Sequence, residues 1–305
     1  MVQPPNLDIN LLLAFLLLFS LSIGVIYTNK SQGITSNNTP PRSLFSIDEG
    51  IELIHPFIIS VSIEKIVDLM KQFPYDTSYK ITKHIIEDKQ STLNQRDKQQ
   101  LILGMAQAFP DKLKLKEKFL NLLLTLDEIS KGPILLINAV NDGHRTLVPA
   151  LIAWAKDNQK AHPELKDLAT KSLYLAIDNN NVDTLKKLQE SGIAIDPKQT
   201  SDLLWYVVEN NKSADFIPFL VSQGSDLSIS KEGHTLVTKA AKSNNLAIIK
   251  ALVSALETKG TSKQKIADYL NRFVDPMVGS AIQIAIQKDY TKLELYLRQQ
   301  GAQEK

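Results

Sequence analysis

The sequence predicts an all-α protein: a helical-repeat solenoid of stacked helix pairs, preceded by a helical N-terminal block and one N-terminal transmembrane or signal helix. Two observations predict this architecture. An almost unbroken apolar run covers residues 9–27, and a helix-pair pattern recurs along residues 131–305. The predicted parts are a transmembrane anchor or signal peptide at 1–28, a flexible linker at 29–43, a helical N-terminal cap at 44–130 that holds degenerate repeats, and the repeats at 131–305.

The apolar run from Ile9 to Tyr27 is 19 residues long and contains only Asn10, Ser20, Ser22 and Gly24 as interruptions. A helix that crosses a bilayer needs about 20 such residues. We therefore expect a single-pass membrane anchor. The alternative is a signal peptide cleaved after the small-x-small pattern at Ser22 and Gly24, which would leave a secreted or periplasmic protein; the absence of Lys and Arg before the run argues against it.

The charges that flank the run predict its orientation. Asp8 precedes it, whereas Lys30 and Arg42 follow it. Because positive charges favour the cytoplasmic side, we expect the repeat domain to lie in the cytoplasm. The linker is polar and ends near Pro40 and Pro41, so it is expected to hold the folded part away from the membrane surface.

The block at 44–130 has helical patterns but no clean repeat. Amphipathic helices are expected at 63–73 and 79–87, a polar stretch at 88–100, and a helix pair at 101–109 and 113–126. Stacked repeats need terminal elements that cover the apolar surface of the end repeats. This block is therefore expected to form such a cap.

The clearest repeat unit lies between Lys231 and Val253. Gly233 can supply a turn with positive φ, and Thr235 can cap the helix that follows. Asn244 and Asn245 interrupt that helix, because Asn tolerates the left-handed conformation. A second helix then follows from residue 246. A helix pair this small cannot bury its apolar face alone, so it predicts neighbouring copies.

The copies align on one small apolar position, which we call the register residue: Ala139, Ala176, Val207, Ala240 and Ala285. The spacings between these positions are 37, 31, 33 and 45 residues. Gly132 and Gly233 each lie seven residues before a register residue, and a terminal glycine follows three of them at Gly192, Gly224 and Gly301. Pro149 and Pro218 mark the first turn of the second helix in two copies. The long last spacing predicts an insertion with a short extra helix at 264–273.

With these positions aligned, residues 132–305 resemble a divergent ankyrin-repeat array. The residues that match the family pattern are Gly233, Thr235, Ala240, Ala241, Ile248 and Leu252; Gly132, Ala139, Gly143, His144, Leu147 and Leu151; and Ala285, Leu293, Leu297, Gly301 and Ala302. No copy keeps the T-P-L-H tetrapeptide, and the mid-repeat glycine occurs only at Gly143. The resemblance implies a scaffold that binds a protein through turn tips and the exposed side of the first helices.

Composition and motifs indicate no catalytic, cofactor or metal site. Lys and Arg number 35 against 33 Asp and Glu, so no basic excess supports nucleic-acid binding, and the chain has no Cys. The five His residues show no zinc-helix spacing, and no phosphate-loop, dinucleotide or nucleophile-elbow motif occurs. We therefore expect no enzyme and no cofactor.

The sequence thus predicts a monomeric, membrane-tethered scaffold that binds an unidentified protein through the concave face of the array. The residues expected on that face are Lys231, Glu232, His234, Lys242, Ser243, Asn141, Asp142 and Tyr206. Trp205, the neighbour of Tyr206, is expected to pack between repeats. The alternative function is an enzyme with an unfamiliar active site in 44–130, whose repeats present the substrate.

Overall fold

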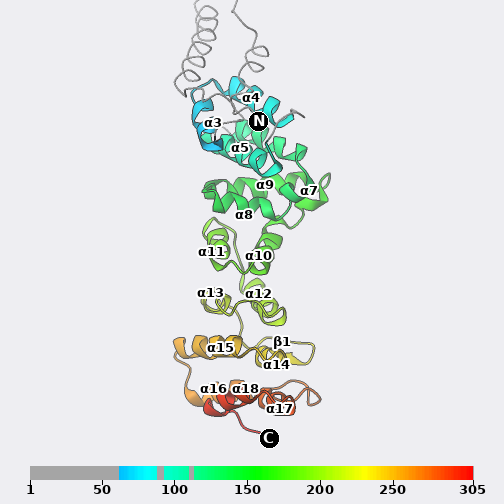
Figure 1. Cartoon of the computed structure of the whole chain (residues 1–305), viewed down its shortest axis with the longest axis vertical. Coiled ribbons are helices and arrows are strands. Elements are labelled where there is room, and N and C mark those ends of the chain that lie inside the picture. Colours follow the sequence, from blue (N-terminus) through cyan, green and yellow to red (C-terminus); the bar gives the residue numbers. More distant parts are fainter. Residues whose placement is uncertain (1–61, 88–92, 110–112, 305) are drawn as a thin grey trace, which may run out of the picture. The chain divides into compact units, whose positions relative to one another are not determined.

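The computed structural model describes residues 62–87, 93–109 and 113–304. In this part of the chain the protein is helical, and the only strands are two of two residues each. The chain divides into two compact units: the described residues up to Leu147 together with Asp157–Glu164, and Val148–Lys156 together with residues 165–304. The all-α fold class is confirmed (Figure 1).

The first unit is built around α5. Its α-helices are α3 (Ile63–Met70), α4 (Tyr75–Glu87), α5 (Gln95–Ala108), α6 (Leu113–Asn121), α7 (Glu128–Lys131) and α8 (Ile134–Asn141), with 3-10 turns η1 (Leu122–Thr125) and η2 (Arg145–Leu147). The central helix α5 packs against α3, α4, α6, α7 and α8. Accordingly its stretch from Leu101 to Ala106 is buried without interruption.

A glycine sets the distance between α3 and α5. A Cβ atom at Gly104 would lie 2.7 Å from Cγ2 of Val67, which is closer than two such carbons can approach. Only glycine therefore allows the two helices to pack at this separation.

Three of the expected helix limits in this unit need correction. The helix expected from Tyr79 begins earlier, at Tyr75. The stretch expected to be polar up to residue 100 is helical from Gln95, because Asn94 and Asp97 form a capping box at this point. The helix expected from 113 to 126 ends as a 3-10 turn, η1, after Asn121.

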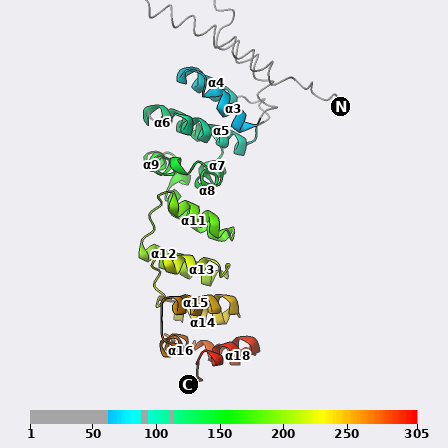
Figure 2. The ribbon, with the colours of Figure 1, turned by 90° about the vertical axis from the view of Figure 1, so that its left-hand side faces the viewer.

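The second unit is a series of helix pairs. The helices after α8 are α9 (Val148–Asn158), α10 (Leu168–Asp178), α11 (Val182–Glu190), α12 (Pro197–Glu209), α13 (Phe216–Ser222), α14 (Leu236–Lys242), α15 (Leu246–Thr258), α16 (Lys263–Asn271), α17 (Ala281–Gln287) and α18 (Thr291–Gln299), with the 3-10 turn η3 (Pro163–Leu165). The pairs α10 and α11, α12 and α13, α14 and α15, and α17 and α18 each pack together. Within this unit α14 packs against both α12 and α17, and α13 packs against α15 (Figures 1 and 2).

The five register residues occupy equivalent places in the structure. Each lies in a helix that precedes a reversal of the chain, and each has no exposed surface: Ala139, Ala176, Val207, Ala240 and Ala285. The small side chains are therefore used where neighbouring helices pack closely. This burial is what the register predicted from the sequence requires.

The reversal after each register residue has one geometry. The residue four positions later has a left-handed backbone in all five copies, with φ between 50° and 85°: Gly143, Asn180, Asn211, Asn244 and Asp289. The N–H of the next residue then donates to the carbonyl oxygen of the register residue, at 2.7 to 3.0 Å. This left-handed turn satisfies a carbonyl that the end of the helix would leave open.

The second helices end in a similar way. A glycine with φ between 73° and 96° follows four of them: Gly192, Gly224, Gly260 and Gly301. The N–H of the residue after each glycine donates to the carbonyl of a leucine five positions earlier, at 2.9 to 3.4 Å: Leu188, Leu220, Leu256 and Leu297. The three terminal glycines seen in the sequence copies, and Gly260 with them, therefore cap these helices.

The first copy departs from the others at two points. Gly132 closes α7 with φ of −73°, whereas Gly233, at the same distance from its register residue, has φ of 76°. The expected equivalence of these two glycines is therefore wrong, because it rested on residue type and spacing alone. The second helix of this copy, α9, ends at Asn158 with no glycine after it, although Pro149 lies in its first turn as expected.

The predicted insertion is present between the last two copies. Its helix, α16, runs from Lys263 to Asn271, close to the expected 264–273. No helix among the described residues is long and apolar enough to cross a bilayer. The predicted membrane segment at 9–27 lies outside these residues, so it remains a prediction.

The left-handed turns predict the effect of substitutions at Asp289, whose side chain is exposed and whose φ is 57°. Asp289→Gly should leave the free energy of unfolding unchanged or raise it. Asp289→Val should lower it by about 1–2 kcal/mol, because a left-handed conformation brings Cβ against the following carbonyl and a β-branched residue tolerates this least. Urea denaturation of both variants measures the difference. Equal stability of the two would show that this turn does not constrain the backbone.

Candidate functional site

A short hairpin lies at the centre of the predicted binding residues. Its strands are β1 (Ser230–Lys231) and β2 (His234–Thr235), which pair antiparallel. Glu232 and Gly233 connect them with φ of 53° and 76°, the left-handed pair that a two-residue hairpin requires. Thr235 also begins α14, since its side chain and that of Thr238 form a capping box. The hairpin is therefore fixed directly to the first helix of its copy.

The hairpin lies against the indole of Trp205 in the preceding copy. Trp205 is buried, as expected, and the ammonium nitrogens of Lys231 and Lys239 each lie 5.8 Å from the centre of its ring. Positive charge near the face of an indole is favourable. The ring therefore anchors two lysines from the next copy.

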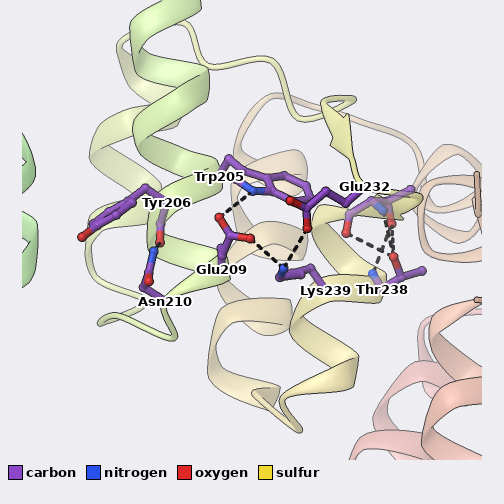
Figure 3. A network of polar contacts seen from close by, with 8 residues as sticks. Trp205, Tyr206, Glu209, Asn210, Glu232, Thr238 and Lys239 are labelled. Atoms are coloured by element: carbon purple, nitrogen blue, oxygen red, sulfur yellow. Dashed lines mark hydrogen bonds and ion pairs between the residues drawn. The ribbon is translucent and has the colours of Figure 1, made fainter.

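Carboxylates neutralise both lysines. Lys239 donates to Oε1 of Glu209 at 2.7 Å, while Oε2 of the same carboxylate accepts the indole N–H of Trp205 at 3.1 Å (Figure 3). Lys231 donates to Asp202 at 2.7 Å. We call Trp205, Lys231, Lys239, Asp202 and Glu209 the tryptophan cluster. The hydrogen bond from Lys239 is the main reason why the pKa of Glu209 is lowered.

Glu232 is the most open of the charged residues at the hairpin. Its side chain is 77% exposed, and its carboxylate lies 3.9 Å from Lys239, which already has a closer partner in Glu209. Its charge is therefore available at the surface. Lys231, which was also expected to face a partner, is half-buried and engaged within the tryptophan cluster.

Tyr206 belongs to a separate contact. Figure 3 shows its ring pointing away from Trp205. It meets Tyr174 edge to face at 4.8 Å between ring centres, and its hydroxyl donates to Asp178 at 2.8 Å. This hydrogen bond is the main cause of the raised pKa of Tyr206. Lys212 also pairs with Asp178, at 2.9 Å. The side chain of Tyr206 thus links two copies and is only half-buried.

His234 does not lie where the sequence placed it. The residue is only 8% exposed, and its Nδ1 is buried with no hydrogen-bond partner among the described residues. Burial lowers the pKa of His234, and the nearby Lys242 and Lys239 lower it further. The expectation that His234 lies on an exposed binding face is therefore wrong, because the residue is almost completely buried.

The remaining expected residues lie in two places. Lys242 and Ser243 are exposed at the C-terminal end of α14. Asn141 and Asp142 belong to the first unit. Asn141 is exposed, whereas the side chain of Asp142 is 12% exposed and accepts a hydrogen bond from Arg96 at 2.6 Å. Asp142 therefore forms an ion pair within its own unit and is not free to contact a partner.

Sequence reasoning missed the polar partners of the tryptophan cluster, although a signal was present. Glu209 lies two positions after its register residue, and Lys239 one position before the next. Asp178 and Tyr206 occupy the same two positions one copy earlier, and they also bond to each other. Two successive pairs of copies therefore show a carboxylate at one position facing a donor at the other. No group of three or more His, Asp or Glu side chains in the described residues could hold a metal ion.

The tryptophan cluster predicts a measurable coupling between Glu209 and Lys239. A double-mutant cycle with Glu209→Gln and Lys239→Met should give a coupling free energy of up to about 1 kcal/mol at neutral pH. The value is small because both side chains are partly exposed and salt screens their attraction. A carboxylate whose folded pKa is lowered stabilises the protein above its unfolded pKa of about 4.3, and this contribution is lost as the pH falls through the folded pKa.

The free energies for this cycle come from urea denaturation at neutral pH and in acid. The pair Lys83 and Glu87 provides the control, since it is half-exposed and its atoms are 3.7 Å apart. Its coupling should be smaller. A coupling for Glu209 and Lys239 that is no larger than the control, or that survives below the folded pKa, would contradict the assignment.

A comparison of the chain with family models, with curated proteins and with solved structures finds no match in any of the three. The function of the chain must therefore be inferred from its own residues and contacts.

Proposed function

We propose that the chain is a membrane-tethered scaffold of ankyrin-like helical repeats that binds a protein partner at the hairpin and the loop beside it. The repeated left-handed turns and buried register residues support a repeat array. The packing of α14 between α12 and α17 supports stacking of successive copies. Arrays of this kind present extended surfaces to partners.

The observation that carries the binding proposal is an exposed apolar loop. Phe273, Val274 and Met277 are 43%, 47% and 93% exposed. Among the described residues only Ile129 and Leu295 are other large apolar side chains with this exposure. Three such side chains within five residues form a local apolar patch, and exposed patches of this kind mark interaction sites.

This loop is held against the hairpin. Arg272 donates to the carbonyl oxygen of Ser228 at 2.6 Å, just before β1. Within the loop, between Val274 and Met277, Asp275 lies close to the hairpin, since a Cβ atom at Gly233 would lie 3.0 Å from its Cβ. The apolar side chains are therefore presented from a fixed loop, which limits the entropy that a partner must remove on binding.

Two carboxylates lie in or next to the loop that carries the apolar side chains. The open carboxylate of Glu232 lies on the hairpin, and Asp275 lies in the loop itself. An apolar centre with a polar rim is the usual anatomy of a protein interface. The partner is expected to offer apolar side chains to Phe273 and Met277, with donors near Glu232.

The membrane part of the proposal rests on the apolar run at 9–27 and on the charges that follow it. With Lys30 and Arg42 on the C-terminal side, the repeats would lie in the cytoplasm. The partner would then be a cytoplasmic protein, or the cytoplasmic part of a membrane protein.

The partner surface can be tested with two matched variants of the full chain. Phe273→Ser with Met277→Ser should weaken binding of captured proteins at least tenfold, because central apolar contacts often contribute more than about 1.4 kcal/mol. Leu295→Ser, at a residue 59% exposed on α18, should leave binding unchanged.

Binding is measured with the full chain carrying a C-terminal tag, extracted in mild detergent, and with circular dichroism to verify that each variant is folded. Loss of the partner in Leu295→Ser alone would place the interface elsewhere. Capture of the same proteins by both variants and the unchanged chain would reject the proposed surface.

The tether can be tested by fractionation. The full chain should stay with membranes in high salt and alkaline carbonate, whereas a chain that begins at Asn29 should not. A mature N-terminus close to Val25 would instead establish a cleaved signal peptide. Membrane association of the shortened chain would show that the run at 9–27 is not the tether.

A further inference from the structure

The first unit contains a cleft that the proposed partner surface does not use. It lies between α3, α5 and the turn after α8, and its volume is about 640 Å³. This size is within the range of small-ligand sites. Residues from α3 and α5 form its walls, and Asp142, Gly143 and His144 form one end.

Hydrogen-bond acceptors predominate at this end of the cleft. The Nδ1 atom of His144 is bonded to Oε1 of Gln107. With Oε1 of Gln107 as the acceptor, Nδ1 carries the proton and donates, and in this tautomer the neutral ring has a lone pair on Nε2. Burial lowers the pKa of His144, which favours the neutral ring. The histidine therefore presents an acceptor.

Two carboxylates add negative charge. Asp142 accepts a hydrogen bond from Arg96 through Oδ1, while its Oδ2 is buried and has no hydrogen-bond partner among the described residues. Burial removes this oxygen from water, and no hydrogen bond within the described residues replaces the lost hydration. Glu64 is exposed on the wall formed by α3, and within the described chain it has no ion-pair partner.

The cations near the cleft are already occupied. Lys71 lies in the wall but pairs with Asp68 at 2.9 Å. Arg96 donates to Asp142 at 2.6 Å and to Gln99 at 3.0 Å. Among the described residues that line the cleft, the charge without a counterion is that of Glu64. A ligand that matches this cleft must donate hydrogen bonds and carry positive charge.

We propose that the cleft between α3 and α5 binds an alkylammonium or guanidinium group. Glu64 supplies the counter-charge, Nε2 of His144 accepts a hydrogen bond, and Asp142, whose charge is paired with Arg96, keeps one oxygen without a hydrogen-bond partner at the end of the cleft. The apolar walls at Ile63, Val67 and Ala108 accommodate the alkyl part. The cation belongs either to a small amine or to a Lys or Arg side chain of a protein.

Binding can be followed by NMR on the full chain in detergent micelles with labelled histidine. The five His residues give few signals, and a His144→Gln variant assigns that of His144. The probes are n-butylammonium and n-butylguanidinium, with n-butanol as the uncharged control. The cations should shift the His144 signal in a saturable way, and butanol should not.

Glu64→Gln should weaken binding of the cations at least tenfold, because one charge-assisted hydrogen bond is lost. Asp76→Asn, at an exposed acid in the first turn of α4, is the matched control and should bind normally. Equal shifts with butanol, or unchanged binding by Glu64→Gln, would overturn the proposal.

The two sources of the cation are distinguished with short peptides. A capped Gly-Lys-Gly or Gly-Arg-Gly peptide that binds more tightly than the free alkyl cation indicates a protein side chain, and weaker binding indicates a small amine. The cleft and the loop at 272–279 belong to different units, so failure here would not affect the proposed partner surface.

Discussion

The left-handed turn between paired helices is the constraint on which the repeats depend. In each copy the helix must stop within one residue of the same point, and the chain must reverse without leaving the last carbonyl unsatisfied. One residue with positive φ and one hydrogen bond back to the register residue achieve both. The first helix accordingly ends two residues after the register residue in every copy, whereas the second helix begins six residues after it in three copies and nine in the other two.

The turn explains why the sequence copies look so different from one another. At this position the chain uses Gly once, Asn three times and Asp once, since each of these residues tolerates a left-handed backbone. The conserved quantity among the copies is a conformation and not a residue type. The spacing and the small register residues can therefore be recognised in the sequence. The turn position cannot be recognised by one residue type, because three residue types occur there.

The sequence predicted the helices, the register and the insertion, because these depend on local periodicity and on glycine, asparagine and proline. It could not predict what each polar residue touches. Glu209 and Lys239 are 30 positions apart and meet only because the helices α12 and α14 pack together. In the same way the burial of His234 depends on contacts that its residue type and its place in a turn do not show. Gly132 and Gly233 share a spacing but differ in φ, a property that residue type does not determine.

The packing of α14 has a consequence for how the molecule unfolds. This helix is only seven residues long, yet it packs against α12 on one side and α17 on the other. A helix of two turns is not stable by itself in water, so it is held by its neighbours. In such an array each helix pair contacts mainly the pairs before and after it, so the stability of one pair depends on its neighbours. Opening of α14 would remove its packing against α17 and leave the last pair, α17 and α18, held by α16 and by the contact between Lys250 and Tyr296, so hydrogen exchange in that pair should rise.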